Sequence, residues 1–267
     1  MTRVAILGVG KLGEALLSGV LRAGRAPADV VVTARRPERG QALADKHGVR
    51  VVSNAAAAAE ADVLLLTVKP QDMATLLGEL AGTVPADRLV ISMAAGTTTA
   101  TIEAALEPGT AVVRVMSNTP VLVDEAMSAI SPGRHASEEH LALTEELLRP
   151  VGKTIRVPES QQDAVTALSG SGPAYFFYLV EAMTDAGILL GLPRQVAHDL
   201  IVQTALGSAL MLRDSGEHPV TLREAVTSPA GTTINAIRVM EDHGVRAAML
   251  SALEAARDRS RQLATGG

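Results

Sequence analysis

The feature that most constrains this chain is a glycine loop directly after an apolar run at its N-terminus. Residues 4–13 read VAILGVGKLG, and Gly8, Gly10 and Gly13 take the spacing G-x-G-x-x-G. In a strand–turn–helix unit the first glycine allows a tight turn, the second lets a pyrophosphate approach the backbone, and the third lets the helix pack on the strand. The helix N-terminus then holds the phosphates. The alternative is an ordinary strand-to-helix turn. The cofactor-binding residues expected here are Gly8, Gly10, Lys11, Leu12 and Gly13.

The composition narrows the class of protein. The chain has 267 residues, of which 47% are hydrophobic and 20% charged, and its net charge is −5. It has no long basic run, so nucleic acid and anionic membranes are poor partners. No apolar run approaches the ~20 residues that span a bilayer. No cysteine is present, so disulfides and thiolate metal sites are excluded, and no metal site is expected. Without a basic segment ahead of the first apolar run, no signal peptide is expected, and a cytoplasmic protein is predicted.

Strands alternate with helices over residues 1–157. The strand patterns predict an α/β fold with a doubly wound parallel (Rossmann) sheet as the dinucleotide-binding domain. Ligands bind such sheets at the carboxyl ends of the strands, where the glycine loop, Arg35, Lys69 and Asn118 all fall. The predicted strands are 3–7, 30–33, 49–52, 62–68, 88–93, 111–116, 125–130 and 153–157. Asn54 is predicted to cap the alanine-rich helix that follows the third strand.

The end of the second strand indicates which dinucleotide is bound. An acidic residue there would bind the 2′-hydroxyl of NAD, but residues 33–37 read TARRP. The guanidinium groups of Arg35 and Arg36 suit a 2′-phosphate, so NADP(H) is preferred and NAD(H) remains possible. The alternative is a solvated pair of charges that opens the next helix.

After residue 157 only helical patterns occur, which predicts an all-helical substrate and dimerisation domain over residues 158–267. Its predicted helices are 159–168, 173–190, 193–213, 222–226, 232–242 and 245–263. The four aromatic residues of the chain are consecutive, from Tyr175 to Tyr178. Core or subunit contact is favoured for Phe176, Phe177 and Tyr178, whereas Tyr175 is close enough to a turn of small residues to face a cleft.

A turn of small and hydroxyl residues, 226–234, opens onto another helix. Backbone N–H groups there, with the hydroxyls of Ser228 and Thr233, can bind a carboxylate. An equally good alternative is a helix start that Thr232 caps. No lysine or arginine lies between Val157 and Pro193, and none of the six histidines sits in a motif. A reaction that needs little acid–base help is therefore favoured, such as hydride addition to a C=N bond.

Taken together, these segments resemble the pyrroline-5-carboxylate reductase family over almost the whole chain. The turn at 227–233, TSPAGTT, is the most specific of the matching segments. The others are the glycine loop, VKP at 68–70, SMAAG at 92–96, RVMSNTP at 114–120, LSGSGPAY at 168–175 and DAG at 185–187.

The resemblance implies an oxidoreductase that reduces 1-pyrroline-5-carboxylate to L-proline with NAD(P)H, the last step of proline biosynthesis. It also implies a homodimer through the helical domain, assembled further, with sites shared between subunits. Thr233 would lie near the ring nitrogen. By the same resemblance, Ser228, Thr232 and Thr233 would hold the substrate carboxylate, Asn54 would contact the adenosine, and Val68, Lys69, Pro70, Ala94, Ala95 and Asn118 would line the cofactor path.

Three positions depart from the family pattern. Ser117 replaces a usual proline, Asp124-Glu125 a glycine-rich turn, and Ala230 a glycine. Ala230 therefore needs a backbone conformation that alanine tolerates, because a positive φ is costly. Two alternative functions remain: reduction of another imino acid, and regulation by an NADPH-binding protein without catalysis. A hydroxyacid dehydrogenase is disfavoured because the substrate-side helix lacks a lysine.

Overall fold

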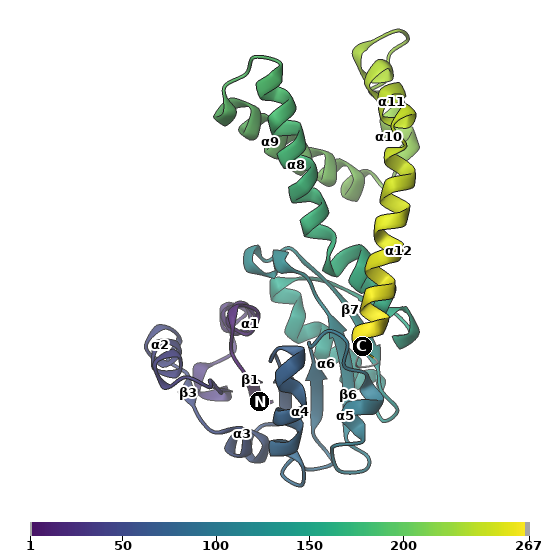
Figure 1. The fold of residues 1–267 in the computed structure, drawn as a ribbon. Coiled ribbons are helices and arrows are strands. Elements are labelled where there is room, and N and C mark those ends of the chain that lie inside the picture. Colours follow the sequence, from purple (N-terminus) through teal and green to yellow (C-terminus); the bar gives the residue numbers. More distant parts are fainter. Residues whose placement is uncertain (1, 265–267) are drawn as a thin grey trace. The chain divides into compact units, whose positions relative to one another are not determined.

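A computed structural model describes residues 2–264 of the chain (Figure 1). The chain divides into two compact units. We call residues 2–171 together with 256–264 the sheet unit, and Gly172–Ala255 the helical unit. The predicted domain boundary between residues 157 and 158 stays a prediction. Among the described residues, no helix is both long and apolar enough to cross a membrane.

The sheet unit is built on an eight-stranded sheet in the order β3-β2-β1-β4-β5-β6-β7-β8. The first six strands are parallel, as predicted for a doubly wound fold. β7 pairs antiparallel with β6, and β8 pairs parallel with β7, so the last two strands run in the opposite direction. The strands are β1 (Val4–Leu7), β2 (Val30–Val32), β3 (Arg50–Val51), β4 (Val63–Leu66), β5 (Leu89–Ser92), β6 (Ala111–Met116), β7 (Ala126–Pro132) and β8 (Gly152–Arg156).

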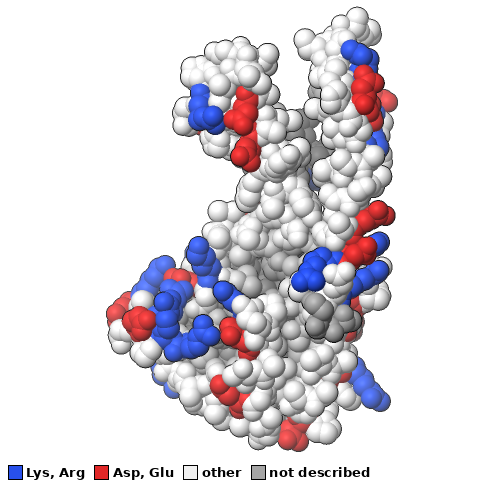
Figure 2. Space-filling view, in the orientation of Figure 1, with Lys and Arg blue, Asp and Glu red and all other residues white. Residues whose placement is uncertain are grey.

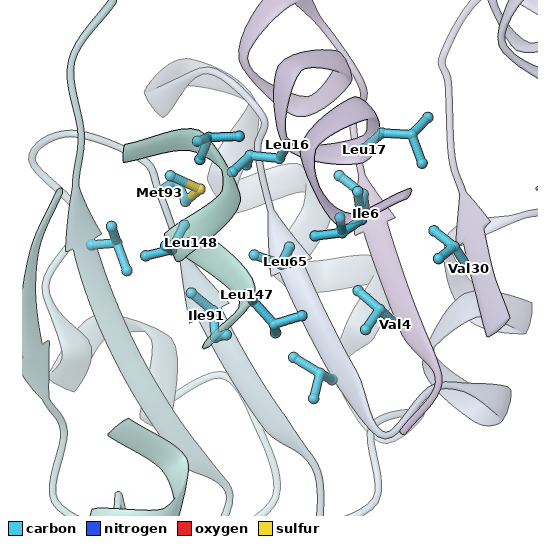
Figure 3. Close-up of a cluster of buried hydrophobic side chains, with 14 of the residues drawn as sticks. Val4, Ile6, Leu16, Leu17, Val30, Leu65, Ile91, Met93, Leu147 and Leu148 are labelled. Atoms are coloured by element: carbon cyan, nitrogen blue, oxygen red, sulfur yellow. The ribbon is translucent and has the colours of Figure 1, made fainter. Parts of the chain in front are cut away.

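Helices cover both faces of this sheet, so its central strands are apolar on both sides. Side chains of α1, α2 and α6 form one core with β1, β2, β4 and β5. Figure 3 shows part of this core, where Leu16 and Leu17 of α1 lie over Ile6. Leu147 and Leu148 of α6 belong to the same cluster. Side chains of α3, α4 and α5 form the core on the other face. The helices are α1 (Lys11–Arg22), α2 (Pro37–His47), α3 (Asn54–Glu60), α4 (Pro70–Leu80), α5 (Thr99–Glu103) and α6 (Glu138–Leu148).

The predicted helix 159–168 is interrupted. A 3-10 turn (Glu159–Gln161), a short helix α7 (Gln162–Val165) and a π-helical turn (Thr166–Gly170) replace it. Polar contacts to the sheet hold this segment. Glu159 accepts hydrogen bonds from the backbone N and the hydroxyl of Thr99, at 2.7 and 2.6 Å. The amide of the buried Gln162 donates to the carbonyl of Ala129 and the hydroxyl of Ser131. The interrupted segment is therefore tied to the sheet by side-chain hydrogen bonds of Glu159 and Gln162.

The helical unit contains α8 (Gly172–Leu189), α9 (Arg194–Ser215), α10 (Pro219–Ala225), α11 (Thr232–Asp242) and most of α12 (Val245–Ala264). α8 and α9 approach closely: a Cβ on Gly187 would lie 2.7 Å from the Cβ of Ala197. Of the described residues in this unit, only Gly172, Thr184 and Ala197 are buried. Phe176, Phe177 and Tyr178 are 65–70% exposed, so they form no core within the chain.

The end of α12 returns to the sheet unit. Ser260 is buried there, and its hydroxyl donates to Asp163 at 2.8 Å. Two of the histidines lie at helix starts. His140 forms a capping box with Ser137 at the start of α6, and His218 caps α10.

Candidate functional site

The glycine loop forms the turn between β1 and α1. Gly8 has φ 78°, and a side chain there would collide with Val68, so glycine is required at this position. A Cβ on Gly13 would lie 2.6 Å from the hydroxyl of Thr67, because α1 packs tightly against the end of β4. Gly10 differs, since a Cβ there would meet nothing within 4 Å. The loop is therefore open at Gly10, where a ligand can approach the backbone.

A cleft of about 860 Å³ lies at the carboxyl ends of the first strands, entirely within the sheet unit. The hydroxyl of Thr33, at the end of β2, accepts a hydrogen bond from the backbone N of Gly8 at 3.0 Å and joins two walls of the cleft. The cleft is lined by Gly8, Val9, Gly10, Thr33, Ala34, Arg35, Arg36, Arg39, Val52, Ser53, Asn54, Thr67, Val68, Lys69, Asp72, Thr75, Leu76 and Glu79.

Basic side chains gather at the β2–α2 side of this cleft. In Figure 2 blue atoms cluster over the region that Figure 1 labels α2. Arg35 is 86% exposed and contacts Asp72 at 3.3 Å, whereas Arg36 is 73% exposed and lies 3.8 Å from Glu38. Arg36 also occupies the N-cap position of α2. Because such exposed ion pairs are weak, both guanidinium groups can turn to an anionic ligand at little cost.

A half-buried ionic cluster fixes the loop to α2. Glu14 of α1 contacts Arg39 at 2.6 Å, Lys46 at 2.8 Å and His47 at 3.3 Å. Hydrogen bonds from Lys46 and Arg39 lower the pKa of Glu14 from 4.5 to about 2, against the opposing effect of burial. Arg39 also donates to the carbonyl oxygen of Val9 at 3.4 Å. The cluster therefore holds the start of α1, and with it the glycine loop, in a defined position.

Asn54 also lines the cleft, and its predicted role as helix cap was wrong. Ser53 is the N-cap of α3 and accepts from the backbone N of Ala56 at 3.2 Å, while Asn54 is the first helical residue. The Asn54 side chain instead donates from Nδ2 to Oε2 of Glu79 in α4, at 2.7 Å. Its Oδ1 is buried and has no hydrogen-bond partner among the described residues.

The turn 227–233 lies in the helical unit and ends at α11. Ala230 has φ 57°, so this alanine takes the left-handed conformation that glycine adopts more readily. A side chain on Gly231 would collide with the hydroxyl of Ser228, so Gly231 lets that hydroxyl pack against the backbone. Gly231, not Thr232, is the N-cap of α11, and no side chain caps the helix. The alternative in which Thr232 caps the helix was therefore wrong.

Three hydroxyl groups surround this uncapped helix start. Thr232 and Thr233 are the first two residues of α11, and Ser228 precedes them in the turn. Within the described part of the chain, none of the three hydroxyls makes a hydrogen bond. An uncapped helix N-terminus offers unpaired N–H groups and the positive end of the helix dipole. The turn can therefore bind a small carboxylate without displacing an existing contact.

Comparison with known proteins identifies the family. A curated pyrroline-5-carboxylate reductase of Corynebacterium melassecola is 46% identical over 267 residues, which cover 98% of this chain and 99% of that protein. The chain belongs to the pyrroline-5-carboxylate reductase family. The family model described as pyrroline-5-carboxylate reductase dimerisation matches residues 159–263, and the one described as NADP oxidoreductase coenzyme F420-dependent matches residues 3–96.

Solved structures of pyrroline-5-carboxylate reductases share the fold. One from Coxiella burnetii is 35% identical, with a TM-score of 0.93 over 98% of both chains. Another, from Plasmodium falciparum with NADP bound, is 24% identical and has a TM-score of 0.87 over 98% of both chains. At that identity the second supports the fold alone.

Some of the predicted cofactor-binding residues of this pyrroline-5-carboxylate reductase family member line the cleft, and others do not. Asn118 lies outside the lining: its Nδ2 donates to the carbonyl and hydroxyl of Ser169 at 3.3 Å, and its Oδ1 accepts from the backbone N of Met127 at 3.0 Å. Gly8, Gly10, Arg35, Arg36, Asn54, Val68 and Lys69 line the cleft, whereas Lys11, Leu12, Gly13, Pro70, Ala94, Ala95 and Asn118 do not.

Sequence reasoning missed several residues of the cleft. Asp72, Thr75, Leu76 and Glu79 line it from α4, at positions that follow the i, i+3, i+4, i+7 pattern of a single helix face. That spacing, counted from Asp72 in the first turn of the helix, could have grouped these residues on one face. Arg39 was also missed, because nothing local marks it apart from other helical arginines.

Proposed function

We propose that this chain catalyses the NADPH-dependent reduction of 1-pyrroline-5-carboxylate to L-proline, the last step of proline biosynthesis. The observation that carries the proposal is the turn before α11. Three hydroxyls that make no hydrogen bond to any described residue lie beside an uncapped helix start, and this arrangement suits a small carboxylate. The name of the Corynebacterium relative, at 46% identity, supports the same activity. A cytoplasmic location remains a prediction from the composition.

The cleft of the sheet unit fits a phosphorylated dinucleotide. The space at Gly10 would admit the pyrophosphate, and Lys11, Leu12 and Gly13 begin the helix whose N-terminus would hold it. Arg35 and Arg36 would bind the 2′-phosphate, Asn54 the adenosine, and Val68 and Lys69 the adjoining path. Pro70, Ala94, Ala95 and Asn118 would line that path toward the nicotinamide. When bound, NADPH supplies the hydride.

The residues of the helical unit would bind and orient the substrate. Ser228 and Thr232, with the first N–H groups of α11, would hold the carboxylate, because a charged acceptor is stabilised there by the helix dipole. Thr233 would accept a hydrogen bond from the protonated ring nitrogen and keep the C=N carbon in place. No group needs to act as a general acid, since the nitrogen carries its proton when the reaction begins.

We further propose that two copies assemble through the helical unit, and that such dimers assemble into a larger oligomer. The exposed apolar side chains of α8 and α9 would be buried between the copies, and each site would use residues of both. The boundary between the two functional domains would lie at residues 157/158, next to residue 159, where the dimerisation family model begins.

The experiment follows NADPH oxidation with and without 1-pyrroline-5-carboxylate. We expect turnover that Thr233→Ala lowers at least tenfold, with nearly unchanged NADPH affinity. Arg35→Ala combined with Arg36→Ala is expected to weaken NADPH far more than NADH; equal losses would refute the phosphate role. No turnover at saturating substrate would overturn the proposed reaction. Turnover of other imines only would then indicate a related imino-acid reductase, and NADPH binding without any turnover a regulatory protein.

A further inference from the structure

Glu79 is a negative charge in a cleft that otherwise suits an anion. Its side chain lines the same cleft as Arg35, Arg36 and the glycine loop, and it makes no ion pair within the described residues. Asp72, the other acidic residue of the lining, lies 3.3 Å from Arg35 in an exposed ion pair. An unpaired carboxylate disfavours a nearby phosphorylated dinucleotide unless it makes a favourable contact with that ligand.

The hydrogen bond between Asn54 and Glu79 fixes the orientation of the Asn54 amide. A carboxylate has only acceptors, so Nδ2 must face Glu79, as the 2.7 Å contact shows. Oδ1 consequently points inward, where it is buried without a partner among the described residues. An unpaired buried carbonyl costs free energy, so Glu79 imposes this orientation against the preference of the amide itself.

As a result, the Asn54 amide and the Glu79 carboxylate present a hydrogen-bond donor next to an acceptor in the lining of the cleft. Nδ2 of Asn54 has a second N–H that Glu79 does not use, and the Glu79 carboxylate has further acceptor sites beside it. The apolar residues Val52, Val68 and Leu76 line the same cleft. A planar base with an amino group next to a ring nitrogen complements such a donor and acceptor, and adenine has that arrangement at its N6 amino group.

We propose that Glu79 and Asn54 read the adenine base of the dinucleotide, with Glu79 accepting from the N6 amino group and Asn54 donating to the neighbouring ring nitrogen. This inference rests on the proposed function, because it takes NADPH as the ligand of the cleft. It makes Glu79 a specificity-determining residue for the base. Hypoxanthine carries an oxygen where adenine carries the amino group, so that oxygen would face the carboxylate and be repelled.

The test compares NADPH with its hypoxanthine analogue, deamino-NADPH, in direct binding titrations. The chain has no tryptophan, so the nicotinamide fluorescence of either ligand can be followed without energy transfer from tryptophan. We expect wild type to bind NADPH about tenfold more tightly than the analogue. Glu79→Ala should bring the two dissociation constants within about twofold of each other. Glu79→Gln, which adds a donor, should favour the analogue relative to wild type.

Two variants separate base recognition from a structural effect. Glu60→Ala breaks the ion pair between Glu60 and Arg50 at the other end of α3, away from the cleft lining, and should leave the tenfold ratio unchanged. In an Asn54→Ala background, Glu79→Ala should change the ratio much less than it does in wild type, since the two residues act together. A loss of structure would weaken both ligands equally.

A wild-type ratio below about twofold, or a tenfold ratio that survives in Glu79→Ala, overturns the inference. The proposed reaction has a separate readout in the turnover of 1-pyrroline-5-carboxylate. NADPH discrimination without turnover would support the base contact and contradict the reaction. Turnover without discrimination between the two dinucleotides would support the reaction and contradict the base contact.

Discussion

The two units of this chain differ in how much of their apolar surface is buried within the chain. The sheet unit covers both faces of its sheet with its own helices, and all residues of its two large apolar clusters lie between residues 4 and 151. The helical unit has three buried residues in its described part and exposes Phe177 at 69% and Leu189 at 89%. Large exposed apolar surfaces of this kind mark protein contacts. The first unit is complete within one chain, whereas the second needs a partner to bury its helices.

The largest expected effect is in the sheet core. Leu65→Ala removes a side chain that is 1% exposed in β4 and should lower the free energy of unfolding by about 2–5 kcal/mol. Chemical denaturation should give this value at every protein concentration. The matched variant Leu206→Ala, at a residue 53% exposed in α9, should cost less than about 0.5 kcal/mol when the chain is dilute. A large cost there under dilute conditions would break the contrast between the units.

The next effect concerns self-association. Phe177→Ala should weaken assembly about 30-fold or more, as the loss of a buried aromatic anchor does at an interface. Sedimentation of a concentration series measures this. Leu122→Ala is the control, because Leu122 is 58% exposed but belongs to the sheet unit. If both variants associate like wild type, the exposed face of α8 is not the contact.

A glycine pair tests the packing inside the helical unit. Gly187→Ala introduces a methyl group 2.7 Å from Ala197 and should cost about 1–3 kcal/mol, which hydrogen exchange in α8 and α9 would detect. Gly207→Ala, in the same unit, meets nothing within 4 Å and should stabilise α9 by up to about 1 kcal/mol. If Gly207→Ala instead weakens assembly, a partner backbone approaches that position.

The smallest effect is the pH dependence of the sheet unit. Lys46 and Arg39 hold the pKa of Glu14 at about 2, below its value of 4.5 in the unfolded chain, so the carboxylate stabilises the fold fully above pH 4.5. That contribution is lost as the pH falls from 4.5 toward 2. Glu14→Gln should cost about 1 kcal/mol at pH 7, after allowance for solvent screening. The difference from wild type should shrink through this window; a constant difference would contradict the assignment.

Local sequence signals predicted much of the fold. α11 spans the predicted residues 232–242. The start of α4 at Pro70 and the end of α2 at Gly48, which takes the left-handed conformation, also follow local residue types. Each of these signals acts through the backbone of its own segment. The choice between Ser53 and Asn54 as cap could not be made this way, because both suit the position. In the structure Ser53 makes the capping hydrogen bond, and Ala57 and Ala58 are buried in the same core as residues of α4.

Parts of the candidate site could not be read from local patterns. Asn54 was expected near the adenosine by resemblance, but its contact with Glu79 crosses from α3 to α4 and has no signal in either segment alone. The predicted difficulty at Ala230 was real, since its φ of 57° is the costly conformation. The antiparallel direction of β7 could not be predicted from the sequence either, because the alternation of side chains along a strand does not encode its direction.

By itself, the sequence determined the glycine loop, the succession of strands and helices, and the family, because these depend on the identity and spacing of neighbouring residues. The tertiary structure decided which helix faces line the cleft, which amide orientation Asn54 takes, and how little of the helical unit is buried within the chain. Those features depend on contacts between residues distant in sequence, and such contacts exist only once the sheet has assembled. Gly10 depends on both: the sequence alone identifies the glycine, but the open space beside it results from the packing of the folded chain.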